Sequence, residues 1–366
     1  MKILTIGSAM HDLFLAYDTP ETITLEIDDC EVNYILLEEG RKIEIKNIHS
    51  HTGGGGTNSA ISFTRLGYNA SVIAKVGKDS DGLFIIESLK KRSINTHFII
   101  QSPHEKTGCS YIIPSPTGNS ALLVYRGANL YLNKKDIPLE QFAKFDYLYI
   151  TSLSEKTSEL LPIICKHAST LNIPIAANPG TSQLTANVQT LQDSLKAIDI
   201  LILNCFEATL LMEQFNVKTK SPKKKQIPNR KLPDLLSAPI NRGNVRFMLQ
   251  EYFIEIHNRG PRIAVVTNGT DGVYVSDGGT IFYHPSLPID CISTVGAGDA
   301  FASTFVAQLM QKKTISNAIR AGIINSASVL EYYDATSGLL DQKELDELIA
   351  EIDPEGIKKF DLGQKI

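Results

Sequence analysis

The chain has 366 residues, of which 43% are hydrophobic, so it is long enough to bury a substantial core in one large domain. Its 36 basic and 40 acidic residues nearly balance, and the net charge of −4 offers no electrostatic footprint for nucleic acid. The five cysteines are widely separated, which argues against a disulfide framework and favours a reducing compartment. Because no run of about 18 apolar residues occurs, we expect a cytoplasmic protein with neither nucleic acid nor a membrane as partner.

Short apolar runs alternate with amphipathic stretches along most of the chain, which is typical of βαβ units around a largely parallel sheet. We predict buried strands at residues 3–6, 71–76, 147–150, 173–177, 200–203 and 263–267. Ligands of such sheets gather outside the carboxyl ends of the strands. The polar or glycine residues that follow the predicted strands are Asp12, Asn178, Asn204, Thr267 and Gly269.

Two stretches break this alternation and have strand-like patterns. They cover residues 13–51 and 97–125, and the second contains a turn sequence at residues 114–119. We expect them to pair into a small β lid that lies over the ligand face and excludes water from the reaction. The alternative is a pair of hairpins that only decorate the core. The α/β core is then discontinuous and consists of residues 1–12, 52–96 and 126–366.

Residues 217–245 are rich in Lys, Pro and Asn and have no clear hydrophobic period, so we predict a surface insertion within the core. The segment contains three consecutive lysines at residues 223–225. Basic runs this short are usually solvated, although contact with a nucleic acid or a membrane is the alternative.

Four consecutive glycines, Gly53 to Gly56, precede Thr57 and Asn58 and a predicted helix. Such a run carries a high entropic cost, which indicates that something approaches the backbone closely. The spacing fits neither the P-loop nor the dinucleotide fingerprint. A bound polyol or phosphate would explain the run, and a flexible hinge between lid and core is the alternative.

The segment from Ser293 to Asp299 reads Ser-Thr-Val-Gly-Ala-Gly-Asp and leads into an apolar helical stretch. Small residues let successive backbone N–H groups converge, and the helix that follows adds its positive N-terminal dipole, so this loop can hold an anion. A carboxylate beside that anion suits a proton acceptor for an attacking hydroxyl, as phosphoryl transfer requires. The alternative is that Asp299 only caps the helix.

With these two motifs, the chain resembles the ribokinase, or PfkB-type, family of carbohydrate kinases. Seven segments match the family's motifs in order: residues 7–12, 53–58, 76–82, 127–129, 204–207, 266–272 and 295–299. The resemblance covers nearly the whole chain outside residues 217–245. It implies an α/β, ribokinase-like three-layer sandwich with a central, mostly parallel sheet and a small β lid. It also implies a homodimer through the lid, as in some members of the family.

The resemblance assigns a role to each matching position. Acceptor-binding residues are Asp12, Gly54, Gly55 and Asn58. ATP-binding residues are Asn204, Thr267, Gly269 and Gly272, and Glu207 helps to hold Mg²⁺ through water. The backbone of Gly296, Ala297 and Gly298 forms an anion hole, and Asp299 is the catalytic base.

This chain also departs from the family pattern. Ser293 stands where ribokinases usually have an Asp that belongs to a monovalent-cation site, so potassium activation is not expected. Met10 replaces an Asn that commonly contacts ribose, which makes ribose itself a weak candidate.

Together these features predict an ATP-dependent kinase that phosphorylates a hydroxymethyl group of a sugar. One alternative keeps the fold but changes the acceptor to a nucleoside such as adenosine, which Met10 favours. Another is a non-catalytic sensor of sugars or nucleotides. Retention of Asp299 argues against the sensor, since a sensor has no use for the base.

Overall fold

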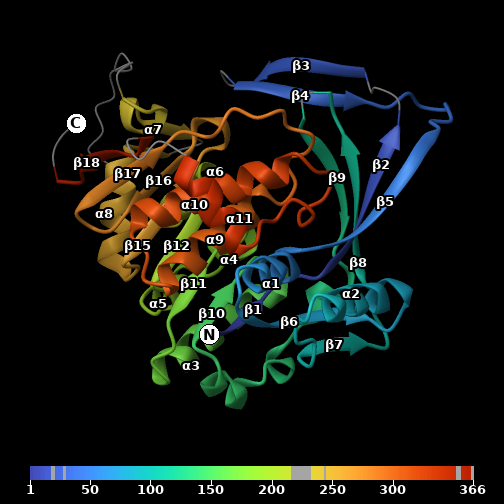
Figure 1. The fold of residues 1–366 in the computed structure, drawn as a ribbon, viewed down its shortest axis with the longest axis horizontal. Coiled ribbons are helices and arrows are strands. Elements are labelled where there is room, and N and C mark those ends of the chain that lie inside the picture. Colours follow the sequence, from blue (N-terminus) through green and yellow to red (C-terminus); the bar gives the residue numbers. More distant parts are fainter. Residues whose placement is uncertain are drawn as a thin grey trace.

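A computed structural model describes residues 1–17, 21–27, 30–116, 118–215, 232–242, 245–351 and 356–363. Within them, ten strands form one central sheet (Figure 1). In spatial order these are β18 (Lys358–Asp361), β17 (Thr280–His284), β16 (Val273–Ser276), β15 (Ile263–Thr267), β12 (Ile200–Asn204), β11 (Ile175–Ala177), β10 (Tyr147–Ile150), β1 (Lys2–Ile6), β6 (Asn69–Gly77) and β7 (Ile99–Ser102).

The central sheet is mostly parallel, as predicted. Strand pairs from β15 through β12, β11, β10, β1 and β6 to β7 are parallel, and only β16, β17 and β18 add antiparallel pairs at one edge. All six strands predicted from the sequence are present, with ends that differ by at most two residues.

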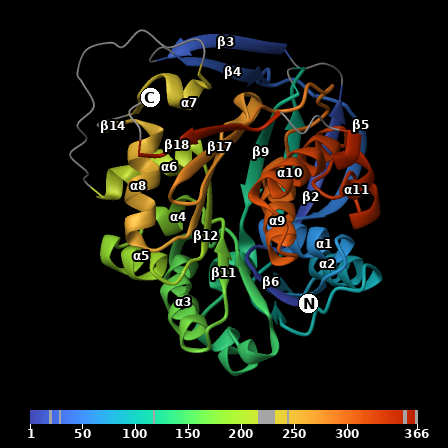
Figure 2. The same cartoon turned by 60° about the vertical axis from the view of Figure 1, so that its left-hand side comes forward.

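Helices cover both faces of the sheet and complete three layers (Figure 2). On one face lie α1 (Gly55–Arg65), α2 (Ser80–Lys91), α9 (Ala297–Met310), α10 (Ile315–Leu330) and α11 (Gln342–Glu351). On the other lie α3 (Leu160–Thr170), α4 (Thr181–Leu184), α5 (Val188–Leu195), α6 (Cys205–Phe215), α7 (Asp234–Ser237) and α8 (Leu249–Arg259). Short 3₁₀ turns are η1 (Gly127–Tyr131), η2 (Lys134–Asp136), η3 (Leu139–Lys144), η4 (Glu155–Glu159) and η5 (Gly269–Asp271).

Burial on both faces explains why the core strands are continuous apolar runs. In β15, Ala264 and Val266 pack into the hydrophobic cluster on one side of the sheet, whereas Ile263 and Val265 pack into the cluster on the other side. Fully burying an aliphatic side chain of this size contributes about 1.5–3 kcal/mol. None of the described helices has the length and apolar composition that a membrane span needs.

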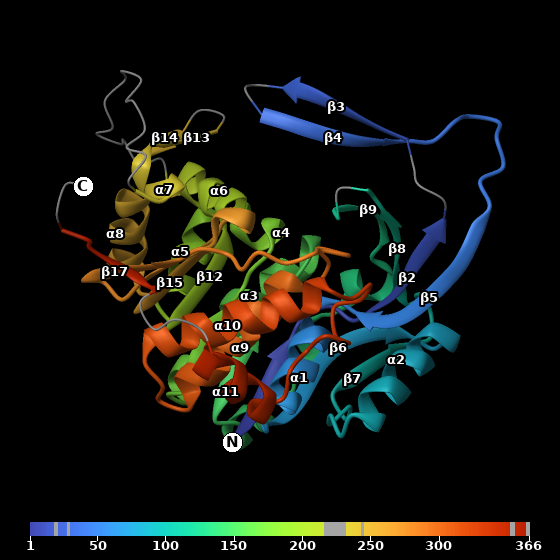
Figure 3. The same cartoon turned by 45° about the horizontal axis from the view of Figure 1, so that its top comes forward.

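A second sheet of four strands lies where the lid is predicted, and we call it the lid sheet (Figure 3). Its order is β5 (Ile45–Gly53), β2 (Met10–Tyr17), β8 (Gly108–Pro114) and β9 (Ser120–Tyr125). A separate hairpin of β3 (Glu21–Ile27) and β4 (Cys30–Leu36) extends from it. One part of the predicted lid is wrong: β7, within residues 97–125, pairs in parallel with β6 and belongs to the core sheet.

Most of the segment predicted as a surface insertion, residues 217–245, lies outside the described residues. Its described part contains α7 and the start of a short hairpin of β13 (Ile240–Arg242) and β14 (Val245–Phe247). Leu235 and Leu236 of α7 are buried against the core. This part of the segment therefore contributes to core packing.

Candidate active site

The four-glycine turn joins the lid to the core, because β5 ends at Gly53 and α1 begins at Gly55. Gly54 has a φ of 95°, and a Cβ on it would lie 2.6 Å from the backbone oxygen of Ser8. A Cβ on Gly53 would collide with the Asp12 carboxylate. The turn therefore needs glycine because the backbone after β1 and the side chain of Asp12 lie directly against it.

Asp12 lies in the middle of the lid sheet, paired with His51 of β5 on one side and Ser110 of β8 on the other. Its side chain is buried, with only 9% of the residue exposed. Burial raises the pKa of Asp12 to about 6, a hydrogen bond from Ser110 opposes this, and the negative charges of Asp299 and Asp334 add to it. Among the residues that the structure describes, no cation lowers the pKa of this carboxylate.

Asp299 lies in the first turn of α9 and contacts the glycine-rich turn directly. The Asn58 Nδ2 donates a hydrogen bond of 2.9 Å to its Oδ2, although the two residues are 241 positions apart. A Cβ on Gly55 would lie 3.4 Å from the Asp299 Oδ1. Burial raises the pKa of Asp299, and the bond from Asn58 opposes that rise. The two sequence motifs therefore meet at this carboxylate.

The buried side chain of Asn58 is only partly satisfied. Its amide nitrogen is bonded to Asp299, but its Oδ1 has no hydrogen-bond partner among the residues described. A buried acceptor without a donor costs about 1–3 kcal/mol. This oxygen is a candidate acceptor for a ligand hydroxyl.

The loop before Asp299 has the geometry of an anion site. Gly296 caps α9 with a φ of 85°, and a Cβ on it would collide with Ala335. The N–H of Ala300 bonds to the Gly296 oxygen, which leaves the earlier N–H groups of Ala297 and Gly298 without acceptors inside the helix. Apart from its own helix and chain neighbours, no described residue comes within 4 Å of a Cβ built on Gly298. The start of α9 therefore offers open donors beside Asp299.

Asn204 and Glu207 form a reciprocal cap at the start of α6. The Asn204 N–H donates to the Glu207 Oε2 at 2.9 Å, and the Glu207 N–H donates to the Asn204 Oδ1 at 2.8 Å. Burial raises the pKa of Glu207, and the charge of Asp299 raises it further. Glu207 therefore lies close enough to Asp299 for the negative charges of the two carboxylates to interact.

Thr267 lies next to Asn204, because these residues are paired at the carboxyl ends of β15 and β12. The following turn has positive φ at Gly269 (52°) and Gly272 (116°). A Cβ on Gly272 would collide with the backbone oxygen of His284, so this glycine is required by packing. Among the described residues, no hydrogen bond joins this turn to Asp299.

Sequence reasoning missed Asp334, which lies in the loop between α10 and α11. Its Oδ1 accepts hydrogen bonds from the N–H and hydroxyl of Thr336 and from the N–H of Ser337, and its Oδ2 lies 3.4 Å from the His51 Nδ1. Burial lowers the pKa of His51. Burial acts to raise the pKa of Asp334, but the hydrogen bonds from Ser337 and Thr336 and the nearby His51 outweigh it and lower that pKa. The only signal in the sequence is an Asp followed two residues later by Thr, which is common in turns.

Aromatic rings line the lid near Asp12. Phe14 lies on the same face of β2, two residues further along, and its ring centroid is 4.7 Å from that of Tyr333. The His49 ring stacks on Tyr333 at 5.2 Å. These rings form an aromatic cluster on the face of β2 that also carries Asp12.

The chain is similar to known kinases along most of its length. Residues 24–342 match the family described as pfkB family carbohydrate kinase. A ribokinase of Bacillus subtilis is 26% identical over 332 residues, which are 88% of this chain and 98% of that protein. An ATP-dependent 6-phosphofructokinase of Thermoanaerobacterium thermosaccharolyticum is 23% identical, over 89% of this chain and 94% of that protein.

Solved structures share the fold at low sequence identity. The crystal structure of a putative ribokinase from Agrobacterium tumefaciens superposes with a TM-score of 0.72 and 18% identity, covering 96% of this chain and 97% of that one. A nucleoside kinase from Methanocaldococcus jannaschii gives a TM-score of 0.70 and 16% identity, covering 96% and 98%. The architecture is thus the ribokinase fold. Since the family match covers most of the chain and the same fold surrounds the site, this protein belongs to the pfkB family of carbohydrate kinases.

Proposed function

We propose that this kinase transfers the terminal phosphoryl group of ATP to a hydroxymethyl group of a sugar, with Asp299 as general base. The observation that carries the proposal is the hydrogen bond between Asn58 and Asp299. It joins the glycine-rich turn and the anion loop at one carboxylate, and the charge of that carboxylate acts on Asp12 nearby.

Proton removal from the acceptor is the task of Asp299. A sugar hydroxyl is a poor nucleophile, so a carboxylate within hydrogen-bond reach must accept its proton as it attacks phosphorus. Burial raises the pKa of Asp299, which strengthens it as a base. The bond from Asn58 fixes the orientation of the carboxylate and leaves its Oδ1 free to accept the proton.

The open N–H groups of Gly296, Ala297 and Gly298 stabilise negative charge on the phosphoryl group during its transfer. They belong to a fixed backbone turn, so they need little reorganisation during the reaction. The N-terminal dipole of α9 adds to their effect.

Acceptor hydroxyls bind to Asp12 and to the Oδ1 of Asn58, beside the backbone of Gly54 and Gly55. Both side chains are buried, and the Asn58 oxygen lacks a donor, so a ligand hydroxyl would satisfy it. The lid sheet contributes Asp12, and closing it over the acceptor excludes water.

The nucleotide lies against Asn204, Thr267, Gly269 and Gly272, at the ends of β12 and β15 and the turn that follows. Glu207 would hold Mg²⁺ through water. The described residues contain no group of three or more His, Cys, Asp or Glu side chains that could cage a metal, and Mg²⁺ ordinarily keeps several waters and binds phosphates with one or two carboxylates. A Mg²⁺ ion held there would supply positive charge that offsets the charge of the phosphates.

A nucleoside is the second candidate acceptor, and the aromatic cluster favours it. Phe14, His49 and Tyr333 form this cluster on the face of β2 that carries Asp12, and Met10 is buried at the start of the same strand. A nucleobase could stack on such rings while its ribose hydroxyls reach Asp12.

A panel of sugars, sugar phosphates and nucleosides, assayed for ADP release, tests both candidates. The proposal predicts turnover with a sugar that bears a free hydroxymethyl group. Turnover confined to nucleosides would support the second candidate. Absence of turnover over the whole panel would favour a sensor.

We further propose that two copies pair through the lid. The edge strand β9 exposes Leu122, Leu123, Val124 and Tyr125, which are 46–58% exposed. Exposed apolar edges are natural pairing surfaces. Leu123→Lys should reduce the mass measured by light scattering to that of one chain, and an unchanged dimeric mass would contradict this pairing.

A further inference from the structure

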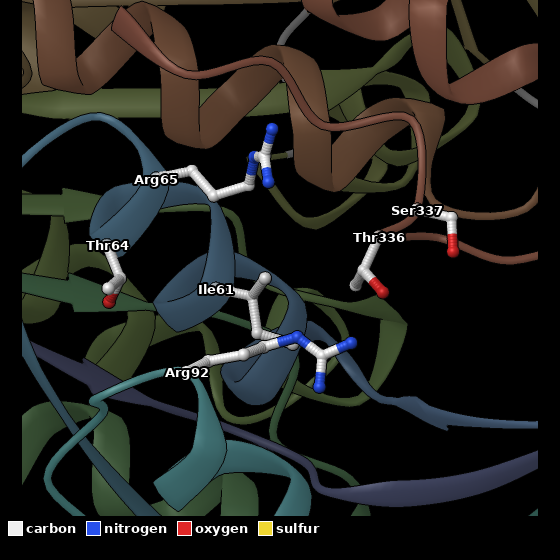
Figure 4. Close-up of a pocket in the computed structure, with 6 residues that line it drawn as sticks. All are labelled: Ile61, Thr64, Arg65, Arg92, Thr336 and Ser337. Carbon is white, nitrogen blue, oxygen red and sulfur yellow. The ribbon is translucent and has the colours of Figure 1, made fainter.

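A cavity of about 420 Å³ lies between α1, the end of α2 and the loop that joins α10 to α11 (Figure 4). It is lined by Ile61, Thr64, Arg65, Arg92, Thr336 and Ser337. None of these residues has a role in the proposed reaction, and none of the six is acidic.

Two arginines give the cavity a positive lining. The Arg92 Nη1 is bonded to the backbone oxygen and hydroxyl of Ser88, which anchors the side chain at the end of α2. Figure 4 shows its guanidinium directed toward Thr336, with Arg65 on another side of the cavity. The Arg65 Nη2 lies 3.3 Å from the Glu344 Oε2, and both side chains are partly exposed, so this ion pair is weak.

Planar guanidinium groups match phosphate geometry, and the Ser337 hydroxyl can donate to a further phosphate oxygen. The hydroxyls of Thr64 and Thr336 already donate to the Ala60 oxygen and the Asp334 carboxylate, respectively. The volume is within the range of about 300–1,000 Å³ that small-molecule sites occupy. An inorganic phosphate ion would fill only a small part of it, and Ile61 offers an apolar surface for the remainder of a larger molecule. The lining therefore suits a phosphate monoester of a small metabolite.

The turn at residues 334–337 lines the cavity on one side and contacts the anion loop on the other. Thr336 and Ser337, which line it, bind the Asp334 carboxylate through their N–H groups. Ala335, between Asp334 and Thr336, packs against Gly296 so closely that a Cβ on Gly296 would collide with it. A ligand that contacts Thr336 and Ser337 would thus hold the turn that supports the anion loop.

We propose that this cavity is an effector site for a phosphorylated small molecule, whose phosphate lies between Arg65 and Arg92 and accepts a hydrogen bond from the Ser337 hydroxyl. Bound there, the ligand stabilises the turn at residues 334–337 and, through it, the anion loop. The effect on turnover rests on the proposed kinase function, whereas the binding itself does not.

Calorimetric titration of the full chain, with ADP and Mg²⁺ saturating the nucleotide site, tests the binding. Inorganic phosphate, glucose 6-phosphate and AMP serve as probes. We expect at least one monoester to bind more tightly than inorganic phosphate, and Arg92→Ala to weaken it about tenfold or more, since a charge-assisted hydrogen bond is lost. Lys91→Ala removes the same charge from the neighbouring exposed position and should change affinity less than about twofold.

Two further variants test the same site in case Arg92→Ala does not fold. Ser337→Asp places a carboxylate at the exposed rim and should abolish monoester binding. Glu344→Gln releases Arg65 and should tighten binding a few-fold. If no probe binds, or if Arg92→Ala and Lys91→Ala behave alike, the effector site is refuted, whatever the kinase activity. If a bound monoester leaves kcat unchanged, the coupling to the anion loop is refuted.

Discussion

Replacing Asp12 by Asn should stabilise the free protein at neutral pH while weakening acceptor binding. Burial raises the pKa of Asp12 from 3.8 to about 6, so the folded protein bears the cost of an ionised, buried carboxylate above that pH. A shift of about two pKa units corresponds to about 3 kcal/mol. The amide keeps the shape of the side chain and can still accept the hydrogen bond from Ser110.

The sign of the pH dependence follows from the direction of this shift. Well below pH 3.8 the carboxyl group is protonated in both the folded and the unfolded state and contributes nothing to stability. The penalty grows as the pH rises from about 4 to 6. The gain in unfolding free energy from Asp12→Asn should therefore be about 3 kcal/mol near pH 8 and about 1 kcal/mol near pH 4.5.

Urea unfolding of the wild type and of Asp12→Asn at these two pH values measures the difference. Asp290→Asn, at an exposed position, is the matched control and should change stability by less than about 0.5 kcal/mol. A gain that is equal at both pH values, or a loss of stability near pH 8, would refute the electrostatic reasoning.

Three other substitutions test separate parts of the site. Asn58→Leu removes the donor that opposes the raised pKa of Asp299, so the acid limb of the kcat profile should move to higher pH. An unshifted profile would argue against Asp299 as the titrating group. In Gly54→Ala the new Cβ would lie 2.6 Å from a backbone oxygen, so the free energy of unfolding should fall by more than about 3 kcal/mol, measured by thermal unfolding. Gly67 has a φ of 85° but open space around it, so Gly67→Ala should lower the free energy of unfolding by only about 1–2 kcal/mol. Glu207→Gln keeps a side-chain acceptor for the helix cap but should raise the Mg²⁺ concentration for half-maximal rate several-fold; an unchanged Mg²⁺ requirement would remove this residue from the metal site.

The core strands could be predicted from the sequence because strands that are buried on both faces appear as continuous apolar runs. β10 and β15 have the predicted bounds, and each is a run of apolar residues. The same reasoning failed for β7, which was assigned to the lid. An alternating pattern identifies a strand but does not say which sheet it joins, and only the pairing with β6 decides this.

The two site motifs were visible because glycine runs and small-residue loops are unusual in composition. The contact between the two motifs could not be predicted, because the Asn58–Asp299 hydrogen bond joins residues 241 positions apart and depends on the packing of α1 against α9. Asp334 left almost no signal, because an Asp in a polar turn is ordinary. Its influence on Asp12 arises only when the loop after α10 lies beside the lid.

The role of Asp299 as base is tested most directly by kcat for Asp299→Asn, measured together with the dissociation constants for ADP and for the acceptor. The amide preserves shape and can still accept the hydrogen bond from Asn58, but it cannot take up the acceptor's proton. We predict that kcat falls about 100- to 10,000-fold, while both dissociation constants change less than about threefold. A kcat within about threefold of the wild type would contradict the account.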